Sequence, residues 1–433
     1  MRPRILYSAA MVLSTLTTFN CGHGINLTTQ QGPTSDRSRS IDQHARIFGG
    51  DTHSCLLSAG GNMCCWGVFP ELEEIWGYSL AGEAWALPIA VASRRVSTLS
   101  FGQSHYCYLS GGQLYCGGSN QLAQLGSPVG RSREGFHPTT LLGPGPFTAV
   151  RSGLYFYTCA LGSSGDVFCW GTLIPPRIDI HPGTLFWTES SHSRRIVSPS
   201  RVRGIVDAVD VSVGSTHACA LNRSGDVYCW GSNNRGQLGP NFVDHPSPVP
   251  GATPALEDRN SEWRRGALRD SPIPLPLHNV RSVSAGDGVT CAITSSGDLH
   301  CWGDSRLFPG DGFNTFAFSG SRATTSFPVR DVGLGAHSSC VVYLSSTMKC
   351  RMGLNGSMFR PWNFSADSIE SFTIGSEHVC FVRSDGTSAC AGDNRYGQLG
   401  NSRALRFSVA AVEMTVCAAD RALQVSSTQT SRR

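Results

Sequence analysis

The sequence has few charges, a single lysine and no long apolar segment. Charged residues make up 15% of its 433 residues, and Lys349 is the only lysine. No run of 18 or more apolar residues occurs, so we expect no transmembrane helix. The chain also lacks a Gly-x-Ser-x-Gly elbow, a His-Glu-x-x-His pair and a Gly-Lys-Ser/Thr phosphate loop. Because no catalytic constellation is present, we expect a protein that is not an enzyme and that uses no cofactor and no metal.

Glycine, proline and cysteine are plentiful instead, with 49, 23 and 17 residues, as is typical of an all-β protein with many turns. Fourteen of the cysteines form pairs that are ten residues apart, or nine in one case. A glycine stands five residues before the first cysteine of six pairs, and six residues before that of the third pair, at Gly153. The pairs are Cys55 and Cys65, Cys107 and Cys116, Cys159 and Cys169, Cys219 and Cys229, Cys291 and Cys301, Cys340 and Cys350, and Cys380 and Cys390.

Each cysteine pair flanks a turn signal, which indicates a β-hairpin. In the second copy the turn at 111–112 is Gly-Gly, and counting outward from it sets Cys107 opposite Cys116. In the fourth copy a three-residue loop at 223–225 ends in a glycine suited to a bulge, and its two cysteines also face each other. Opposed residues have Cα atoms roughly 4.5–5.5 Å apart, within the range of a disulfide. Zinc sites are the alternative, but they normally space paired cysteines by two to four residues. We therefore favour a disulfide across each hairpin.

The stretch 211–239, VSVGSTHACALNRSGDVYCWGSNNRGQLG, resembles the repeat of the regulator of chromosome condensation family. It matches the pattern V-S-x-G-x-x-H-x-C-A-L, then G-x-V-x-C-W-G, then N-x-x-G-Q-L-G, and related copies run from about Arg46 to Val412. The resemblance implies an all-β fold, a seven-bladed β-propeller closed by pairing an N-terminal strand with strands from the C-terminal end. The cysteine-rich form is similar to repeats of exported bacterial proteins. The nuclear member of the family exchanges nucleotide on a small GTPase, which gives an alternative function, but repeats alone do not carry function over.

The chain divides into four parts. Residues 1–24 have the arginines and the 12-residue apolar stretch of an export signal, and 25–45 form a polar, flexible linker. We assign 46–415 to the propeller and 416–433 to a disordered polar tail. Elongated connections are expected at 68–94, 172–204, 241–278 and 304–328, and we expect them to form one variable face.

Cys21 follows the apolar stretch directly, where a lipoprotein leader would be lipidated and anchored to a membrane. Phe19 and Asn20 are unlike the small residues that such a site prefers. Ordinary cleavage near Gly24 and an uncleaved start remain alternatives. We expect a secreted, periplasmic or cell-surface protein in either of the first two cases.

Cys64 and Cys417 are also left over by the pairing. Register favours Cys65 over Cys64 as the partner of Cys55. Cys417 would bond Cys64 if ring closure brought the two ends together, and free or leader-linked thiols are the alternative.

The repeat histidines and tryptophans have a structural and a functional interpretation. The histidines two residues before a first cysteine would be metal ligands if the ring gathered them, but a ring keeps equivalent positions apart. We expect each to bond the backbone of its own blade. The tryptophans of the Cys-Trp-Gly motif would either stack a ligand or pack between blades, and we favour packing. These residues are His53, His105, His217 and His378, and Trp66, Trp170, Trp230 and Trp302.

Trp187 and Trp263 lie outside the motif, in long connections near arginine pairs, of which Arg264 and Arg265 adjoin Trp263. Tryptophan and arginine are typical anchors of binding surfaces, so Trp187, Trp263, Arg264 and Arg265 are candidate contacts for an unidentified protein partner, with solvated loops as the alternative. The formal net charge is +4, or +2 without residues 1–24, which argues against nucleic-acid binding. We predict a monomeric, exported protein-binding module.

Overall fold

The computed structural model describes residues 46–57, 63–67, 96–127, 146–173, 177–181, 184–188, 195–233, 235–239, 268–304, 322–323, 327–354, 357–400 and 407–413. These residues form antiparallel sheets with no helix among them. The described part therefore also contains no helix that could cross a bilayer.

Seven sheets of three or four strands make the blades, numbered here in chain order. Blade 1 contains β1 (Arg46–Gly49), β2 (His53–Leu57) and β3 (Met63–Gly67). Blade 2 contains β4 (Val96–Phe101), β5 (His105–Ser110) and β6 (Gln113–Gly118). Blade 3 contains β7 (Phe147–Ser152), β8 (Phe156–Gly162), β9 (Val167–Thr172) and β12 (Arg195–Arg201). Blade 4 contains β13 (Ala208–Val213), β14 (His217–Asn222), β15 (Val227–Ser232) and β16 (Leu268–Pro274). Blade 5 contains β17 (Val280–Ala285), β18 (Val289–Thr294), β19 (Leu299–Gly303) and β20 (Arg322–Ala323). Blade 6 contains β21 (Val329–Leu334), β22 (Ser338–Tyr343), β23 (Met348–Leu354) and β24 (Ser357–Ala366). Blade 7 contains β25 (Ile369–Ile374), β26 (His378–Arg383), β27 (Ser388–Asp393) and β28 (Phe407–Glu413).

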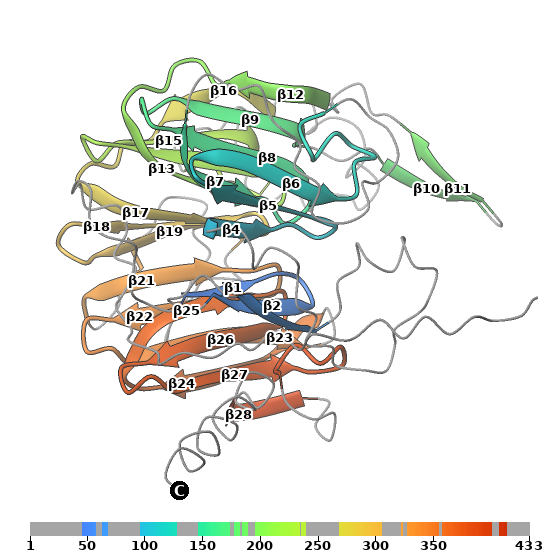
Figure 1. Ribbon diagram of the computed structural model, residues 1–433. Helices are drawn as coiled ribbons and strands as arrows, with labels where there is room; N and C mark the ends of the chain where they lie inside the picture. Colours follow the sequence, from blue (N-terminus) through green and yellow to red (C-terminus); the bar gives the residue numbers. More distant parts are fainter. Residues whose placement is uncertain are drawn as a thin grey trace, which may run out of the picture.

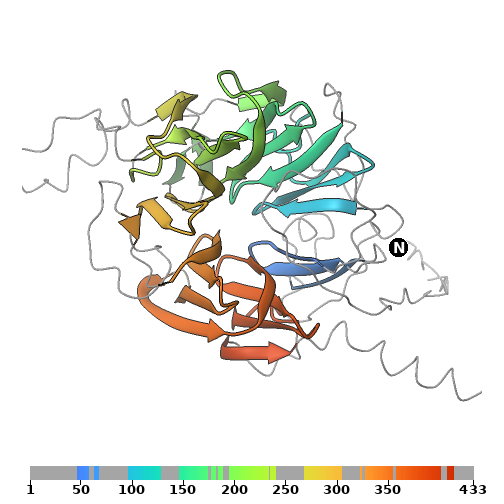
Figure 2. The same cartoon turned by 90° about the vertical axis from the view of Figure 1, so that its left-hand side faces the viewer.

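The blades stand around an axis that their first strands surround. The first strand of each blade contacts the first strands of both neighbouring blades, and the contact between β1 and β25 completes the ring. Figure 1 shows the blades side by side, and Figure 2 shows them following one another around the ring in sequence order. The prediction of an all-β, seven-bladed propeller is confirmed.

Strand pairing within the blades follows the predicted register. Cys107 lies opposite Cys116 across a turn whose two glycines, Gly111 and Gly112, both have positive φ. The fourth copy pairs Cys219 with Cys229, and its loop places Gly225 at φ 84°. The one-residue difference in loop length therefore explains the spacings of nine and ten.

The glycine before each second strand is required by the approach of neighbouring blades. In blades 2 to 7 an added Cβ would meet the carbonyl oxygen of the corresponding glycine in the next blade, and blade 7 meets blade 1 in this way. Six such contacts link Gly102, Gly153, Gly214, Gly286, Gly335, Gly375 and Gly50 in order around the axis. The repeated glycine is therefore a packing requirement of the ring.

Replacing Gly375 with alanine is expected to lower the free energy of unfolding by about 1–3 kcal/mol. The new Cβ would lie 2.1 Å from the His378 ring of its own blade and 2.6 Å from the carbonyl oxygen of Gly50, a main-chain atom across the closure of the ring. Urea unfolding followed by tryptophan fluorescence measures the change. Gly162→Ala is the matched control, because its nearest neighbour atom would be 3.5 Å away. Equal losses in the two variants would contradict the packing account.

Closure of the ring differs from the expectation in one respect. Among the described residues β1 pairs only with β2, and β28 pairs only with β27, so no N-terminal strand pairs with C-terminal strands. The expectation of such pairing is wrong for this part of the chain. Blade 1 instead packs face to face on blade 7, as the other neighbouring blades do, and Ser54 and Trp66 hydrogen-bond across this interface to His378 and Gln398.

The expected long connections are wrong in extent, because three of them contain outer strands. The stretch 172–204 contains β12 and a separate hairpin, 241–278 contains β16, and 304–328 contains β20. The outermost strand of a blade has only one neighbour, so its sequence tolerates proline and irregular pairing and loses the clear alternation of an inner strand.

Candidate functional site

The seven predicted cysteine pairs each join as a disulfide across the second and third strands of a blade. Their Cα atoms are 4.0–4.1 Å apart, as in the narrow pairs of an antiparallel ladder. All fourteen residues are at most 3% exposed. Cys64 lies opposite Leu56 in the register, so Cys65 is the partner of Cys55, as expected.

Three of the four repeat histidines join one blade to the next. Their Nε2 atoms lie within hydrogen-bond distance of a hydroxyl that stands directly before the first cysteine of the following blade. The pairs are His105 with Thr158 at 2.8 Å, His217 with Thr290 at 2.7 Å, and His378 with Ser54 at 2.8 Å. His53 packs edge-on against the ring of Phe101, with 4.4 Å between centroids. For His105, His217 and His378 the expected bonding to backbone within the same blade is therefore wrong, because the second strand is covered on both faces and its side chains meet the neighbouring blade.

Burial holds these imidazoles neutral. Loss of water lowers the pKa of His105 to about 3 and the pKa values of His217 and His378 to about 4. The neutral ring both accepts and donates, which suits a hydroxyl partner. Histidines of this kind fit a structural bond better than a metal site. Among the described residues no group of three or more metal-ligating side chains occurs.

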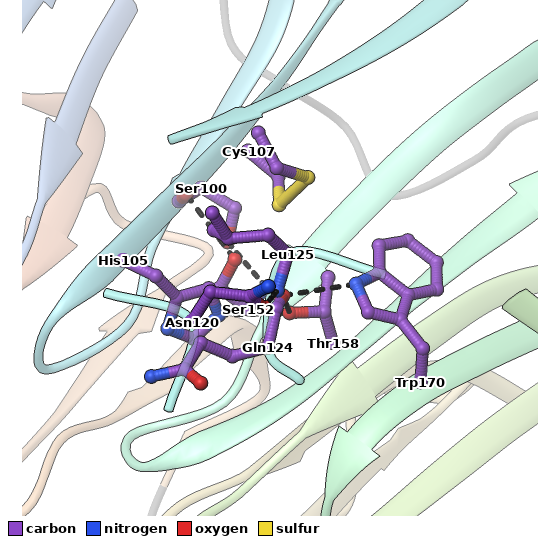
Figure 3. The surroundings of a disulfide bond; sticks show 10 residues. Ser100, His105, Cys107, Asn120, Gln124, Leu125, Ser152, Thr158 and Trp170 are labelled. Carbon is purple, nitrogen blue, oxygen red and sulfur yellow. Dashed lines mark hydrogen bonds between the residues drawn. A yellow bond between two sulfur atoms is a disulfide. The ribbon is translucent and has the colours of Figure 1, made fainter. Parts of the chain in front are cut away.

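A loop with the pattern Asn-x-x-Gly-Gln-Leu-Gly, in which blade 2 has alanine at the fourth position, explains which blades are joined in this way. In blade 2, Asn120 Oδ1 accepts the amide of Leu125 at 3.0 Å, and the Gln124 side chain accepts the amide of Leu122 at 2.9 Å. These bonds fold the loop so that the carbonyl of Gln124 faces blade 3, where Trp170 Nε1 donates to it at 2.9 Å (Figure 3). We call the histidine–hydroxyl bond together with the tryptophan–glutamine bond the interblade clamp.

The clamp recurs wherever the loop motif occurs. Gln237 and Gln398 accept from Trp302 and Trp66 at 2.8 Å each. The clamps thus join blades 2 and 3, 4 and 5, and 7 and 1, and packing of the motif tryptophans between blades is confirmed for these three. Trp230 is different: it is 2% exposed, and its Nε1 has no partner among the described residues. Blade 3 lacks the loop motif, and so the acceptor is missing.

The axis of the ring contains two cavities. The larger, about 460 Å³, is lined by the first strands and includes Asp210 and Asp331. Burial raises the pKa of Asp331 to about 6 and also raises that of Asp210, while the arginines nearby oppose the shift. Arg151 lies 3.5 Å from Asp210, and each aspartate accepts the amide of the residue after it. These carboxylates could not be found from the sequence, because the repeat pattern does not specify this strand position.

The smaller cavity, about 160 Å³, lies at one mouth of the axis, among the loops that join first and second strands. Its wall includes Asp51, Tyr155, Asp287 and His337. We call the side of the ring that carries these loops the mouth face. The third strand of each blade also ends beside these loops, because the register pairs its last residues with the first residues of the second strand.

A two-stranded hairpin leaves blade 3 on the mouth face. Strands β10 (Arg177–His181) and β11 (Thr184–Thr188) follow Thr172, which pairs with Phe156 next to the mouth loop. Figure 1 shows the hairpin standing off the ring. Trp187 lies on β11 opposite Ile178. The structure thus places this predicted partner contact on a projecting element.

The other predicted site residues lie outside the described part of the chain. They are Trp263, Arg264 and Arg265, together with Cys21 and Cys417, and the interpretations placed on them stay predictions.

The repeat model of the regulator of chromosome condensation (RCC1) matches residues 208–237, 280–307 and 369–398, which are parts of blades 4, 5 and 7. The chain carries RCC1 repeats.

Two relatives are similar to part of the chain. Protein pim1 of Schizosaccharomyces pombe is 27% identical over 57% of this chain and 44% of its own length. The secretion-regulating guanine nucleotide exchange factor of Bos taurus is 30% identical over 45% of this chain and 41% of its own length. The chain therefore spans less than half the length of these relatives. The structure of Prp20p from Saccharomyces cerevisiae superposes with a TM-score of 0.60 at 16% identity, covering 82% of this chain and 85% of that one, which shows a shared fold.

Proposed function

We propose that this RCC1-repeat chain is an exported protein-binding module that takes its partner on the mouth face. The observation that carries the proposal is the β10–β11 hairpin, which projects from blade 3 beside the mouth loops. Binding residues are commonly carried by loops and short elements that a rigid scaffold positions. The ring supplies such a scaffold, because buried disulfides and interblade clamps fix the strands below the mouth face.

Export is the part of this proposal that the cysteines support. Fourteen cysteines stand in facing pairs, and disulfides persist in oxidising compartments outside the cytosol. The export-like segment at 1–24 supports the same location. A lipid on Cys21 would add a membrane anchor.

Nucleotide exchange on a small GTPase is the second candidate. It is favoured by the names of relatives, two of which are guanine nucleotide exchange factors from Bos taurus and Saccharomyces cerevisiae. That activity belongs to the cytosol or nucleus, where thiols are kept reduced. The paired cysteines favour the exported module over it.

Removal of the hairpin is expected to abolish partner capture. In the variant, residues 177–188 are replaced by a short Gly-Ser linker, and the purified protein is immobilised beside the parent chain. Both are exposed to medium and envelope fractions of the producing cells, and bound proteins are quantified by mass spectrometry. At least one protein should be retained by the parent and fall at least tenfold with the variant, because its anchor is gone.

Leu344→Ser is the control for this experiment. Leu344 is 63% exposed and lies in the turn between β22 and β23, on the opposite side of the ring. It should retain the same protein as the parent does. Equal retention by the parent and the hairpin variant would rule out the hairpin as the anchor, and loss only with Leu344→Ser would rule out the mouth face. Accelerated release of fluorescent GDP from a small GTPase would favour the second candidate.

A further inference from the structure

One mouth loop breaks the sevenfold pattern. Six of the loops between first and second strands place their glycine five residues before a cysteine, whereas Gly153 stands six residues before Cys159. The extra residue belongs to the segment Leu154–Tyr155, and both residues line the mouth cavity. Departures from a repeat that are not needed for folding are where function is expected. Blade 3, which also carries the hairpin, thus brings an aromatic ring to the axis.

Tyr155 stands close to two carboxylates. Loss of water raises the pKa of its phenol, and the negative charges of Asp287 and Asp51 raise it further, while Arg235 opposes them. The ring and both carboxylates line the same cavity, which is the geometric basis of this influence. The Nδ1 atom of His337, in the same wall, is buried and has no partner among the described residues.

The described loops of the mouth face carry more acidic than basic residues, although the whole chain has a formal net charge of +4. Its described loops carry five carboxylates and two arginines. These are Asp51, Asp287, Asp304, Glu377 and Asp393, and Arg235 and Arg395. Both arginines are held by ion pairs: Arg235 lies 3.0 Å from Asp287 and 3.5 Å from Asp304, and Arg395 lies 2.8 Å from Glu377 and 2.9 Å from Asp393.

Asp51 is left with a hydroxyl as its partner. Ser376 Oγ donates to Asp51 Oδ1, and no lysine or arginine of the described residues forms an ion pair with this carboxylate. The cavity beside it, about 160 Å³, is similar in size to cavities of about 150 Å³ that hold a benzene-sized molecule. A planar group of that size with several donors would satisfy Asp51 and cover the ring of Tyr155. A guanidinium has this shape, this charge and this donor pattern.

We propose that the mouth cavity takes one arginine side chain of the protein partner, with its guanidinium bonded to Asp51 and stacked on Tyr155. The inference rests on the proposed function for the identity of the donor, a protein that docks on the mouth face. It adds the chemistry by which that protein is recognised. Asp287 is not the main ligand, because Arg235 already pairs with it and Ser215 Oγ donates to it.

The test uses a small probe in place of the unidentified partner. Nα-acetyl-arginine amide is titrated into the full chain, and the ring resonances of Tyr155 are followed by NMR after selective tyrosine labelling. Nα-acetyl-citrulline amide, which has the same shape without the charge, is the matched probe. We expect saturable shifts at millimolar arginine amide and at least fivefold weaker binding of citrulline amide.

Three variants complete the design. Asp51→Asn should weaken binding of the arginine probe at least fivefold, and Tyr155 remains as the NMR reporter. Tyr155→Leu should weaken binding of this probe by a similar factor, which calorimetry measures. Asp367→Asn removes a charge from an exposed residue on the opposite side of the ring and should change nothing. Equal binding of both probes, parent-like binding by Asp51→Asn, or preference for Nα-acetyl-lysine amide over the arginine probe would overturn the inference.

Failure of this inference and failure of the proposed function are distinguishable. A chain that captures a partner through the hairpin but binds arginine and citrulline probes alike keeps the proposed function and loses the arginine site. A chain that binds the arginine probe through Asp51 and captures nothing keeps the site and loses the docking role.

Discussion

Acidification from pH 7.5 to 5 is expected to lower the free energy of unfolding by roughly 4–5 kcal/mol. The pKa values of His105, His217 and His378 are lowered by burial to about 3, 4 and 4, against an unfolded value of 6.5. Groups with depressed pKa values contribute stability that is complete above pH 6.5 and is lost as the pH falls toward the folded pKa. At pH 5 the contribution of each histidine to the free energy of unfolding has fallen by about 2 kcal/mol.

Asp331 opposes this loss. Burial raises its pKa from 3.8 to about 6, so its contribution is complete below pH 3.8 and is lost as the pH rises through 6. Lowering the pH from 7.5 to 5 therefore lets Asp331 raise the free energy of unfolding by about 1 kcal/mol. The net change remains a large fraction of the stability of an ordinary domain.

Urea unfolding at a series of pH values measures the effect. His217→Gln keeps a hydrogen-bonding side chain beside Thr290 and should remove about a third of the histidine contribution, while Asp331→Asn should steepen the acid loss by about 1 kcal/mol. His278→Gln is the control, because that imidazole is 75% exposed, and it should keep the full slope. A flat profile in the parent chain would show that the clamp histidines are not buried as neutral rings.

Complete reduction of the disulfides is expected to unfold the ring. Each bond closes a loop of about ten residues, which in the chain-entropy model is worth somewhat under 3 kcal/mol. Seven such contributions exceed the roughly 5–15 kcal/mol by which domains of ordinary stability fold. The fully reduced chain should therefore fail to refold from urea, as circular dichroism and tryptophan fluorescence would show.

Thiol counting makes the same point on protein from its native compartment. Of 17 cysteines, 14 are paired, so at most three thiols should react in denaturant without reductant. With reductant the count should be 17, or 16 where Cys21 is removed or lipidated. Cys219→Ala with Cys229→Ala should lower the free energy of unfolding by about 2–5 kcal/mol without unfolding the ring. Fourteen or more reactive thiols without reductant would contradict both the pairing and export.

The sequence predicted the hairpins well because each depends on local chemistry. Turn glycines such as Gly112 and Gly225 and the distance between paired cysteines determine the register before any long-range contact is known. The outer strands β12, β16 and β20 were harder to predict, because a strand with one neighbour keeps little periodicity.

Contacts between blades could be predicted only in part. The packing of Trp170 follows from its place in the motif, but the bond from His105 to Thr158 joins residues 53 positions apart and has no local signal. The mouth cavity had one signal, the shifted spacing of Gly153, and its meaning needed the structure, since only the ring brings Tyr155 near Asp51.

The uneven distribution of interblade clamps gives the circle weak and strong seams. Blades 2 and 3, 4 and 5, and 7 and 1 behave as three doublets, and blade 6 is a singlet with no clamp on either flank among the described residues. Its Ser339, in the position that a clamp would use, is fully buried without a hydrogen bond. We therefore expect heat or mechanical tension to open the circle at a seam without a clamp and to leave each doublet whole.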